Sequence, residues 1–312
     1  MDIKKALVIM NPKSGQGDHE ELRQQVEAYL TRAEVSYDIR ETAGEQDAFG
    51  WARDAQGYDL VLVSGGDGTV MEVMSGLIKN EAAIPLAQLP AGTANLLARA
   101  LAIPTDPAEA LELALNGVVV PLDVGYLPDH DRYFALIAGA GWDAQLIEDA
   151  SRTLKDRFGF FAYVITGVKN LFQLQRSRIE LDIDGKRQRF RAHTVMVMNV
   201  GELAGTGLKI GEDISPHDGK LNLAIASPNT LGGVVRLLYR LATGQLGNYR
   251  DLRYFSASKV RITATPPLQV QIDGEALGQT PLYAEAVPEG ALLVVPASYA
   301  TEKGLKDVRD KS

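Results

Sequence analysis

The stretch from residue 60 to residue 69 reads Leu-Val-Leu-Val-Ser-Gly-Gly-Asp-Gly-Thr. Its apolar start predicts a buried strand, and three glycines within four positions predict a tight loop that leads straight into a helix. Glycine permits positive φ and lets a phosphate approach the backbone N–H groups. The helix N-terminus behind such a loop favours negative charge. The stretch therefore predicts a phosphate-binding loop in an α/β fold.

Asp67 is the unusual member of this loop, because a carboxylate beside a bare phosphate would repel it. The residue makes chemical sense if Mg²⁺ lies between the two, as in a metal–nucleotide complex. One alternative stays open, in which Asp67 and Gly68 form an ordinary turn while Gly65 and Gly66 serve only tight packing.

Two further loops follow the same design. Residues 88–95, Gln-Leu-Pro-Ala-Gly-Thr-Ala-Asn, come after an apolar run and offer a permissive Gly92, the hydroxyl of Thr93, and Asn95 as a cap or phosphate contact. Residues 11–17, Asn-Pro-Lys-Ser-Gly-Gln-Gly, end the first apolar run. Each loop alone is ordinary loop and cap chemistry. Three loops at one sheet edge predict a nucleotide site.

Around these loops, strand and helix patterns alternate with short connections, which predicts a doubly wound, Rossmann-like parallel sheet. This N-terminal α/β domain is expected to cover residues 1–124. We expect strands at residues 6–10, 35–40, 59–63, 84–89 and 118–124, and helices at residues 20–30, 47–55, 70–78, 94–101 and 107–115.

After residue 124 the pattern changes to strands that mostly follow one another, with Asp-Gly turns at residues 184–185, 218–219 and 273–274. This predicts a C-terminal, antiparallel β-rich sandwich domain over residues 125–289. The polar tail after Tyr299 is expected to fray. We expect strands at residues 178–183, 189–199, 221–226, 259–264 and 268–272, and helices at residues 157–174 and 231–242.

Composition narrows the function. The 312 residues exceed one usual core and favour two domains. A net charge of −8 argues against nucleic acid as a partner. Without cysteine there is no disulfide, thiolate metal site or Cys nucleophile. The sequence shows neither a signal peptide nor an apolar run of the roughly 18 residues that a membrane span needs, so a soluble, cytoplasmic protein is expected.

Familiar catalytic patterns are absent, including the P-loop and the G-x-S-x-G nucleophile motif. The four histidines are scattered and are interpreted as surface or structural residues. Residues 139–144, Gly-Ala-Gly-Trp-Asp-Ala, imitate a dinucleotide fingerprint but come after the alternation has ended. The turn at Asp273, Gly274 and Glu275 offers two carboxylates, one of which could accept a proton from an attacking hydroxyl; an ordinary hairpin is the alternative.

Taken together, these motifs resemble the catalytic family of the diacylglycerol kinases, which includes sphingosine kinases and bacterial lipid kinases. Residues 11–15 resemble its opening motif, residues 65–69 its signature loop, residues 90–99 its third motif, and residues 273–275 its late acidic motif. Order and spacing fit across nearly the whole chain. The signature loop is shared with NAD kinases and, in variant form, with phosphofructokinases, so the first and third motifs are what indicate lipid kinases.

The resemblance implies a nucleotide on the first domain, an acceptor mainly on the second, and residues 290–312 packed back on the first. It implies that Asp67 and Asp123 organise catalytic Mg²⁺ and that Glu275 is the proton acceptor with Asp273 beside it. Which of these two carboxylates takes the proton stays open. The implied ATP-binding residues are Asn11, Ser14, Thr42, Gly65, Gly66, Asp67, Gly68, Thr69, Val70, Met71, Gly92, Thr93 and Asn95.

Bacterial members of the family also carry a structural Mg²⁺ on a loop that here reads Ser-Pro-His-Asp-Gly-Lys-Leu, residues 215–221. The resemblance implies that Asp218 supplies its side chain and that Ser215 and Lys220 supply backbone carbonyls. Without the resemblance this loop would be a plain turn.

The expected function is an ATP- and Mg²⁺-dependent kinase for a hydroxyl of diacylglycerol or a related glycerolipid or sphingoid lipid. A kinase of a soluble acceptor such as NAD, or a nucleotide-binding regulator without catalysis, are the alternatives. Residues 151–178 and 231–261 each hold six basic residues against one acid, and the first includes an aromatic run. These segments predict peripheral contact with the inner membrane surface, unless the aromatics build a core. A homodimer is left open.

Overall fold

The computed structural model describes residues 3–15, 19–80, 82–141, 176–203, 208–209, 214–228, 230–243, 248–273 and 275–311. The chain divides into two units, and each is described by itself below. Unit 1 comprises Met1–Leu122 with Glu289–Ser312, and unit 2 comprises Asp123–Pro288. The chain crosses between them twice, once within a strand on the way out and once within a strand on the way back.

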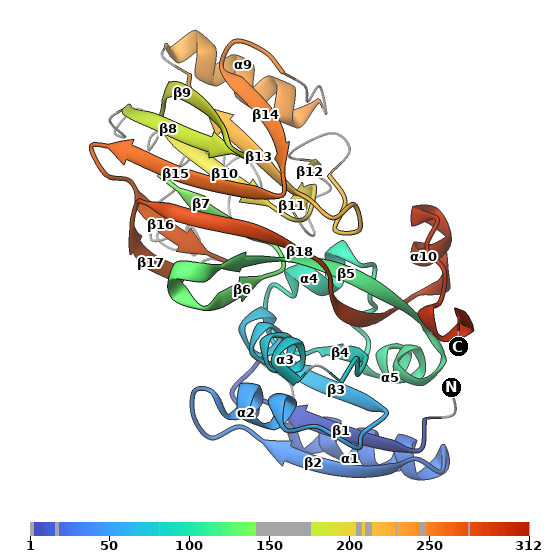
Figure 1. Ribbon diagram of the computed structural model, residues 1–312. Coiled ribbons are helices and arrows are strands. Elements are labelled where there is room, and N and C mark those ends of the chain that lie inside the picture. Colours follow the sequence, from blue (N-terminus) through green and yellow to red (C-terminus); the bar gives the residue numbers. More distant parts are fainter. Residues whose placement is uncertain are drawn as a thin grey trace. The chain divides into compact units, whose positions relative to one another are not determined.

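Unit 1 alternates strands and helices along its first part (Figure 1). Its strands are β1 (Lys5–Met10), β2 (Ser36–Glu41), β3 (Leu60–Gly65), β4 (Leu86–Pro90), the start of β5 (Val118–Leu127) and the end of β18 (Leu282–Val295). Its helices are α1 (His19–Arg32), α2 (Asp47–Arg53), α3 (Asp67–Asn80), α4 (Leu96–Ala100), α5 (Pro107–Asn116), α10 (Ala297–Lys303) and the 3₁₀ turn η2 (Val308–Lys311).

The strands of unit 1 pair in the order β2-β1-β3-β4-β18, and each of these pairs is parallel. Helices α1 and α5 cover one face, where Val26, Leu30 and Leu111 pack on the apolar side chains of β1 and β3. Helices α2 and α3 pack together over the other face (Figure 1). This is the doubly wound sheet that the sequence predicts. The chain leaves β1 on one side for β2 and on the other side for β3, which creates a topological switch point between β1 and β3.

Unit 2 consists mainly of antiparallel strands. They are β6 (Arg132–Phe134), β7 (Ile137–Ala140), β8 (Ser177–Ile183), β9 (Lys186–Ala192), β10 (Thr194–Met198), β11 (Glu202–Leu203), β12 (Leu208–Lys209), β13 (Leu221–Ala226), β14 (Leu252–Ala257), β15 (Lys259–Thr265), β16 (Gln269–Ile272) and β17 (Glu275–Gln279), with the 3₁₀ turn η1 (Pro128–His130) and helix α9 (Leu231–Ala242) between them.

Two antiparallel sheets in unit 2 form a sandwich. One follows the order β14-β13-β10-β7-β16-β17, and the other contains β18-β15-β8-β9. Alternating side chains of both sheets meet in one core, with Ile179 and Leu181 of β8 facing Val195 and Val197 of β10 within the same apolar cluster. The period of two in β8 explains why its other side chains are polar and reach solvent.

Helix α9 lies on the outer side of the first of these sheets, where Leu237 joins an apolar cluster with Met198, Ala224 and Leu252. Among the helices of the described ranges, none combines the length and apolar character that crossing a bilayer requires.

Three sequence-based expectations need correction. Residues 189–199 do not form one strand, because β9 pairs with β8 in one sheet while β10 pairs with β13 and β7 in the other. The chain changes sheets at His193, whose ring is buried and bonds the carbonyl of Pro228 at 2.9 Å. Helix α3 begins at Asp67 rather than Val70, so Gly68 lies in its first turn.

The third correction concerns the tail after Tyr299, which is structured rather than frayed. Helix α10 begins at Ala297, and η2 follows at Val308. Arg309 donates to the carbonyl of Gly117 at the end of α5 and pairs with Asp307, so the polar residues of the tail bind the C-terminal end of this helix. The predicted helix at residues 157–174 lies outside the described residues.

Candidate functional site: phosphate loops and acidic turns

The first two predicted loops meet at the switch point of the unit 1 sheet. The backbone N–H of Asn11 donates to the carbonyl of Ser64 at 2.8 Å. The side chain of Asn11 donates through Nδ2 to Oγ1 of Thr69 at 2.9 Å, and its Oδ1 accepts from the N–H of Lys13 at 3.0 Å. Asn11 therefore joins the end of β1 to the first turn of α3, and its amide is used to hold the loops together.

The third loop lies directly on the second. The N–H of Ala91 donates to the carbonyl of Gly65 at 3.1 Å. Oδ1 of the half-buried Asp67 accepts the N–H of Leu97, at the start of α4, at 3.1 Å. The carboxylate predicted to face a metal therefore also ties the second loop to the third.

Glycine is required where the loops touch. Gly15 has φ of +79°, and a Cβ at this position would lie 2.0 Å from the carbonyl oxygen of Ala91. A Cβ on Gly92 would lie 2.5 Å from Cα of Gly66. These distances leave no room for any side chain, so the close approach of three backbones depends on glycine.

Asn95, predicted as a cap or a phosphate contact, lies at the N-cap position of α4. It is buried, has φ of 48°, and its side-chain amide bonds both the N–H and the carbonyl of Gly92, at 2.9 and 2.8 Å. With its amide occupied in this way, Asn95 shapes the third loop from inside.

Other predicted nucleotide contacts differ in exposure. Gly68 and Thr93 are exposed, and Ser14 and Met71 are partly exposed. Val70 is fully buried, so only its backbone faces the loop region, and Val70 donates its N–H to the carbonyl of Gly66 at 3.1 Å. The accessible hydroxyls of Ser14 and Thr93 suit phosphate oxygens.

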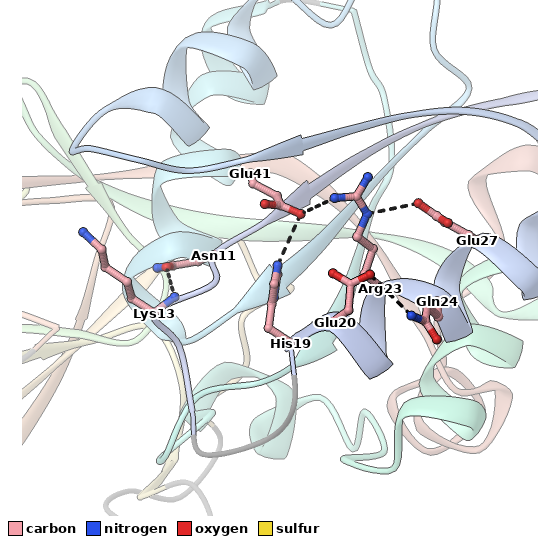
Figure 2. A network of polar contacts seen from close by, with 8 residues as sticks. All are labelled: Asn11, Lys13, His19, Glu20, Arg23, Gln24, Glu27 and Glu41. Atoms are coloured by element: carbon pink, nitrogen blue, oxygen red, sulfur yellow. Dashed lines mark hydrogen bonds and ion pairs between the residues drawn. The ribbon is translucent and has the colours of Figure 1, made fainter.

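Thr42 directly follows β2, and its N–H donates to the carbonyl of Met10 at 2.9 Å. The neighbouring Glu41 lies between His19 and Arg23 of α1, as Figure 2 shows. Its Oε1 lies 2.8 Å from Nη1 of Arg23 and 3.4 Å from Nε2 of His19. These contacts fix the end of β2, on which the position of Thr42 depends.

The loop after Thr42 is fixed by Asp47 at the start of α2. Its Oδ2 accepts the N–H groups of Ala43 and Gly44 at 2.9 and 2.8 Å. These two donors lower the pKa of Asp47 below its ordinary value, because they stabilise the ionised carboxylate.

In unit 2, Asp123 lies in β5 and is buried. Its N–H donates to the carbonyl of Pro216 at 2.8 Å, and its Oδ2 accepts the N–H of Gly219 at 2.6 Å. Nδ2 of Asn199 donates to the backbone carbonyl of Asp123 at 2.7 Å. Asp123 is therefore built into the loop that the resemblance assigns to a structural Mg²⁺.

Asp218 in this loop has a pKa above its ordinary value, first because burial disfavours the charged carboxylate and also because Asp123 is close. A cation would relieve both effects. Asp218 with the backbone carbonyls of Ser215 and Lys220 offers the hard oxygen donors that Mg²⁺ takes. Over the described residues, no group of three or more Asp, Glu or His side chains is placed so that it could hold a metal ion. A Mg²⁺ here would therefore rely on carbonyls and water for its remaining ligands.

Asp273 and Glu275 have separate surroundings at the turn between β16 and β17. The N–H of Asp273 donates to the carbonyl of Ile137 at 2.8 Å, and Oδ1 of Asp273 accepts the N–H of Ile137 at 2.9 Å. Glu275 is exposed, and its Oε2 accepts from Nη2 of Arg132 at 2.8 Å. Asp273 therefore fixes the turn, while Glu275 presents its carboxylate to solvent.

The structure brings together the predicted residues of unit 1 at one sheet edge, and in unit 2 it joins Asp123 to the loop of Asp218. Gly274, Gln16 and Gly17 lie outside the described residues, as do residues 142–144 of the glycine-rich stretch after β7. Sequence reasoning missed Arg132 and Asn199. Neither belongs to a motif, and both find their partners through strand pairing far along the chain.

Comparisons with known proteins identify the family of the two domains. Residues 5–127 match the model of the diacylglycerol kinase catalytic domain, and residues 137–295 match that of the YegS C-terminal NAD kinase beta sandwich-like domain. A diacylglycerol kinase of Bacillus subtilis (strain 168) is 31% identical over 282 residues, which cover 89% of this chain and 92% of the relative. A diacylglycerol kinase of Staphylococcus aureus (strain bovine RF122 / ET3-1) is 29% identical, with 89% and 88% covered.

Solved structures show the same fold. A diacylglycerol kinase structure from Bacillus anthracis str. Sterne aligns with a TM-score of 0.76 at 24% identity, covering 96% of this chain and 99% of that one. A second structure from the same organism reaches a TM-score of 0.82 at 25% identity, covering 96% and 97%.

Fold, loops and relatives together define a kinase, that is, a phosphotransferase with a doubly wound domain and a β-sandwich domain. More narrowly, the chain belongs to the diacylglycerol kinase family.

Proposed function

We propose that this protein is an ATP- and Mg²⁺-dependent lipid kinase that phosphorylates a hydroxyl of diacylglycerol or a related glycerolipid or sphingoid lipid. The observation that carries the proposal is the convergence of three loops at the switch point of unit 1, with Gly15, Gly66 and Gly92 at their contacts. Backbone amides and hydroxyls brought together in this way suit a nucleotide triphosphate.

The proposed chemistry is an in-line phosphoryl transfer. The acceptor hydroxyl oxygen forms a bond to the γ-phosphorus, and the bond from that phosphorus to the β,γ-bridging oxygen breaks. The hydroxyl proton passes to Glu275, and the products are ADP and a phosphomonoester. The loops of unit 1 hold the phosphoryl group, and the Asp273 turn of unit 2 presents Glu275.

Metal chemistry is assigned to the acidic residues that fit it. Mg²⁺ bound by Asp67, with Asp123 as the second implied carboxylate, would neutralise charge on the transferring phosphoryl group. Asp67 keeps a partly exposed carboxylate for this role, whereas Asp123 is buried and already accepts the N–H of Gly219. The second ion, at Ser215, Asp218 and Lys220, would be structural.

A soluble acceptor is the second candidate function. The family model matched by residues 137–295 is described as NAD kinase beta sandwich-like, and the signature loop is shared with NAD kinases. A regulator without catalysis is less well supported, since an exposed Glu275 held by a dedicated arginine has no purpose in a pure nucleotide binder.

The test is a kinase assay with ATP and Mg²⁺ on a total lipid extract and, separately, on NAD, with products identified by mass. A phosphorylated lipid is the expected product. Glu275→Gln should lower kcat by roughly 10²–10⁴-fold with ATP affinity little changed. Phosphorylated NAD without a lipid product would replace the proposal by its alternative, and nucleotide binding without either product would leave the regulator.

Peripheral contact with the inner membrane surface is part of the same proposal. Residues 151–175 lie outside the described residues, so the second basic segment is the one to examine. Helix α9 exposes Arg236, and Tyr239 is 60% exposed, which suits an interface where aromatic and basic groups meet headgroups. Vesicle co-sedimentation tests it. Binding that rises with anionic lipid and falls in Arg236→Gln is expected, and equal binding to neutral vesicles would contradict it.

A further inference from the structure

We propose that Arg132 is a positioning residue for phosphoryl transfer, because it holds the carboxylate of Glu275 in the orientation that accepts the hydroxyl proton. This inference rests on the proposed function, in which Glu275 is the proton acceptor. Arg132 lies in β6, and 143 positions separate the two residues along the chain. No sequence motif contains both.

The contact between Arg132 and Glu275 involves one of the two carboxylate oxygens of Glu275. Nη2 of Arg132 donates to Oε2 at 2.8 Å. Within the described part of the chain, no residue donates to Oε1 of Glu275. A carboxylate that is held through Oε2 has less rotational freedom at its end, so Oε1 would meet an acceptor hydroxyl from a defined direction.

The segment that carries Arg132 holds the acidic turn at a second point. Ile137 follows five residues later and exchanges two hydrogen bonds with Asp273, at 2.8 and 2.9 Å. Residues 132–137 thus contact the start of the turn through Ile137 and its end through Arg132. Asp273 sets the backbone of the turn, and Arg132 sets the side chain that follows it.

Arg132 itself stands on a stiff hairpin between β5 and β6. The hydroxyl of Tyr126 donates to Asp131 at 2.8 Å, and the rings of Tyr126 and Tyr133 lie 4.7 Å apart. Phe134 is fully buried, and its ring fills the space beside Gly125, where a Cβ would lie 2.0 Å from it. The base of the hairpin is therefore packed in the core while its tip carries Arg132 outward.

Stability does not explain this ion pair. The side chains of Arg132 and Glu275 are 46% and 61% exposed, and ion pairs this exposed contribute little to stability. The proposed benefit of the ion pair is catalytic instead. Fixing a reacting group before the substrate binds lowers the entropic part of the activation barrier for phosphoryl transfer. Arginine suits this task because its planar guanidinium loses little freedom for each hydrogen bond it makes.

A double-mutant cycle on kcat tests the inference, with ATP and Mg²⁺ and with diacylglycerol as the acceptor. Arg132→Gln should lower kcat about tenfold with the KM for ATP unchanged. The same change should cost nothing in a Glu275→Gln background, because there is no carboxylate left to orient. Arg132→Lys should recover part of the loss, since the ammonium keeps the charge without the planar geometry.

Arg189→Gln is the matched control. Arg189 also belongs to unit 2 and lies 3.5 Å from a carboxylate, that of Glu180, but on the outer strand β9. Its kcat should equal that of the wild type. Equal losses from Arg132→Gln in both backgrounds would show a merely structural role, and full kcat in Arg132→Gln would overturn the inference while Glu275→Gln remained impaired. Wild-type kcat in Glu275→Gln would instead overturn the proposed function, and the inference with it.

Discussion

The two regions predicted to act on substrates are held in place by different means. In unit 1 the loops after β1, β3 and β4 are joined by side chains such as Asn11 and Asp67, but they also touch backbone to backbone, most closely at Gly15 and Gly92. In unit 2 the turn after β16 and the loop around Asp218 are held by side chains that bond backbone groups, such as Asp273 with Ile137 and Asp123 with Gly219.

The two regions should therefore differ in the substitutions that they tolerate. A site made of backbone contacts admits no added atom, because the neighbours are rigid and already in contact. A site held by side chains can be altered by degrees, since each contact contributes on the order of 1 kcal/mol and has chemical substitutes. Nucleotide binding in unit 1 is therefore expected to fail abruptly on substitution, and the acidic turns of unit 2 to weaken gradually.

The largest expected effect is at Asp67. In Asp67→Asn the amide oxygen can still accept the N–H of Leu97, now 3.1 Å away, so the loops should stay joined while the negative charge is lost. Turnover should fall by roughly 10³-fold or more, because the charge needed to hold Mg²⁺ beside the phosphates is gone. The melting temperature should not change.

Asp67→Ala sharpens this prediction, since it also removes the bond to Leu97 and should lower stability by about 1 kcal/mol. The measurements are single-turnover kinetics and thermal unfolding. A folded Asp67→Asn protein with normal activity would sink the assignment of the nucleotide site to this loop.

The next largest effect is expected at Gly15. Gly15→Ala places Cβ 2.0 Å from the carbonyl oxygen of Ala91 in a backbone with φ of +79°, which itself costs about 1–2 kcal/mol. The first and third loops must separate, so the Kd for ATP should rise at least about tenfold with a loss of stability near 2 kcal/mol. Isothermal titration and urea unfolding measure both.

Gly50→Ala serves as the control for Gly15→Ala. Gly50 lies in α2 and a Cβ there has nothing within 4 Å, so alanine should be neutral or stabilise the helix by up to about 1 kcal/mol. If both variants behaved alike, the contrast between the two regions would not hold for unit 1.

Asn199 tests the side-chain contacts of unit 2. It is fully buried, and its Nδ2 donates to the carbonyls of Asp123 and Ala135 at 2.7 and 3.0 Å. Asn199→Ala leaves both carbonyls without this donor and should cost roughly 2–4 kcal/mol in urea unfolding.

Asn80 in unit 1 is the comparison for Asn199, because its Nδ2 also donates to two carbonyls, those of Ala52 and Arg53. Asn80 is only partly buried, so water can replace the donor and Asn80→Ala should cost under about 1 kcal/mol. Similar losses in the two variants would show that burial does not govern these contacts.

The smallest effect concerns Mg²⁺ at Asp218. Mg²⁺ at tenfold excess over its Kd should stabilise the protein by about 1.4 kcal/mol, and Asp218→Asn should remove this gain. Calorimetric scans with and without Mg²⁺ measure it, with Ca²⁺ as a second probe. An equal gain in Asp218→Asn would place the ion elsewhere.

The pKa of Asp218 gives this stabilisation a pH dependence. The folded-state pKa is raised above the ordinary value of 3.8, so the folded protein binds the proton more tightly than the unfolded chain does. Without Mg²⁺, stability contributed by this group is present below pH 3.8 and is lost as pH rises through the raised pKa. The stabilisation by Mg²⁺ should have the opposite pH dependence. The proton and Mg²⁺ compete for the carboxylate of Asp218, so the gain from Mg²⁺ should shrink as pH falls.

Much of unit 1 could be predicted from the sequence, because β1, β3 and β4 are short apolar runs followed by a loop signal and a helix. The parallel order follows from that alternation, and the placement of three loops at one edge follows from the parallel order. The sequence pattern predicts the start of α3 three residues too late, because glycine is a poor helix former. Gly68 lies in the first turn, where the low helix propensity of glycine costs least.

Unit 2 was harder to predict. The run at residues 189–199 is a continuous strand pattern, and only pairing with distant partners shows that it divides at His193 between two sheets. Contacts such as Arg132 with Glu275 and Asn199 with Asp123 join residues 143 and 76 positions apart, so no local pattern contains them. The Asp-Gly pair predicts the acidic turn. The different roles of its two carboxylates depend on tertiary contacts, because Asp273 bonds Ile137 and Glu275 pairs with Arg132.

The double crossing of the chain has a consequence for synthesis. Unit 1 needs residues 289–312, in which Leu293 pairs with Leu86 and Arg309 binds Gly117, and these residues are synthesised after the whole of unit 2. Until then β4 lacks a neighbour on one side, even though β1, β3 and every phosphate loop have already been made. Unit 2 is continuous in sequence, so it can fold before unit 1 is complete. The nascent chain therefore holds all of unit 2 before the residues that complete the sheet of unit 1 have been made.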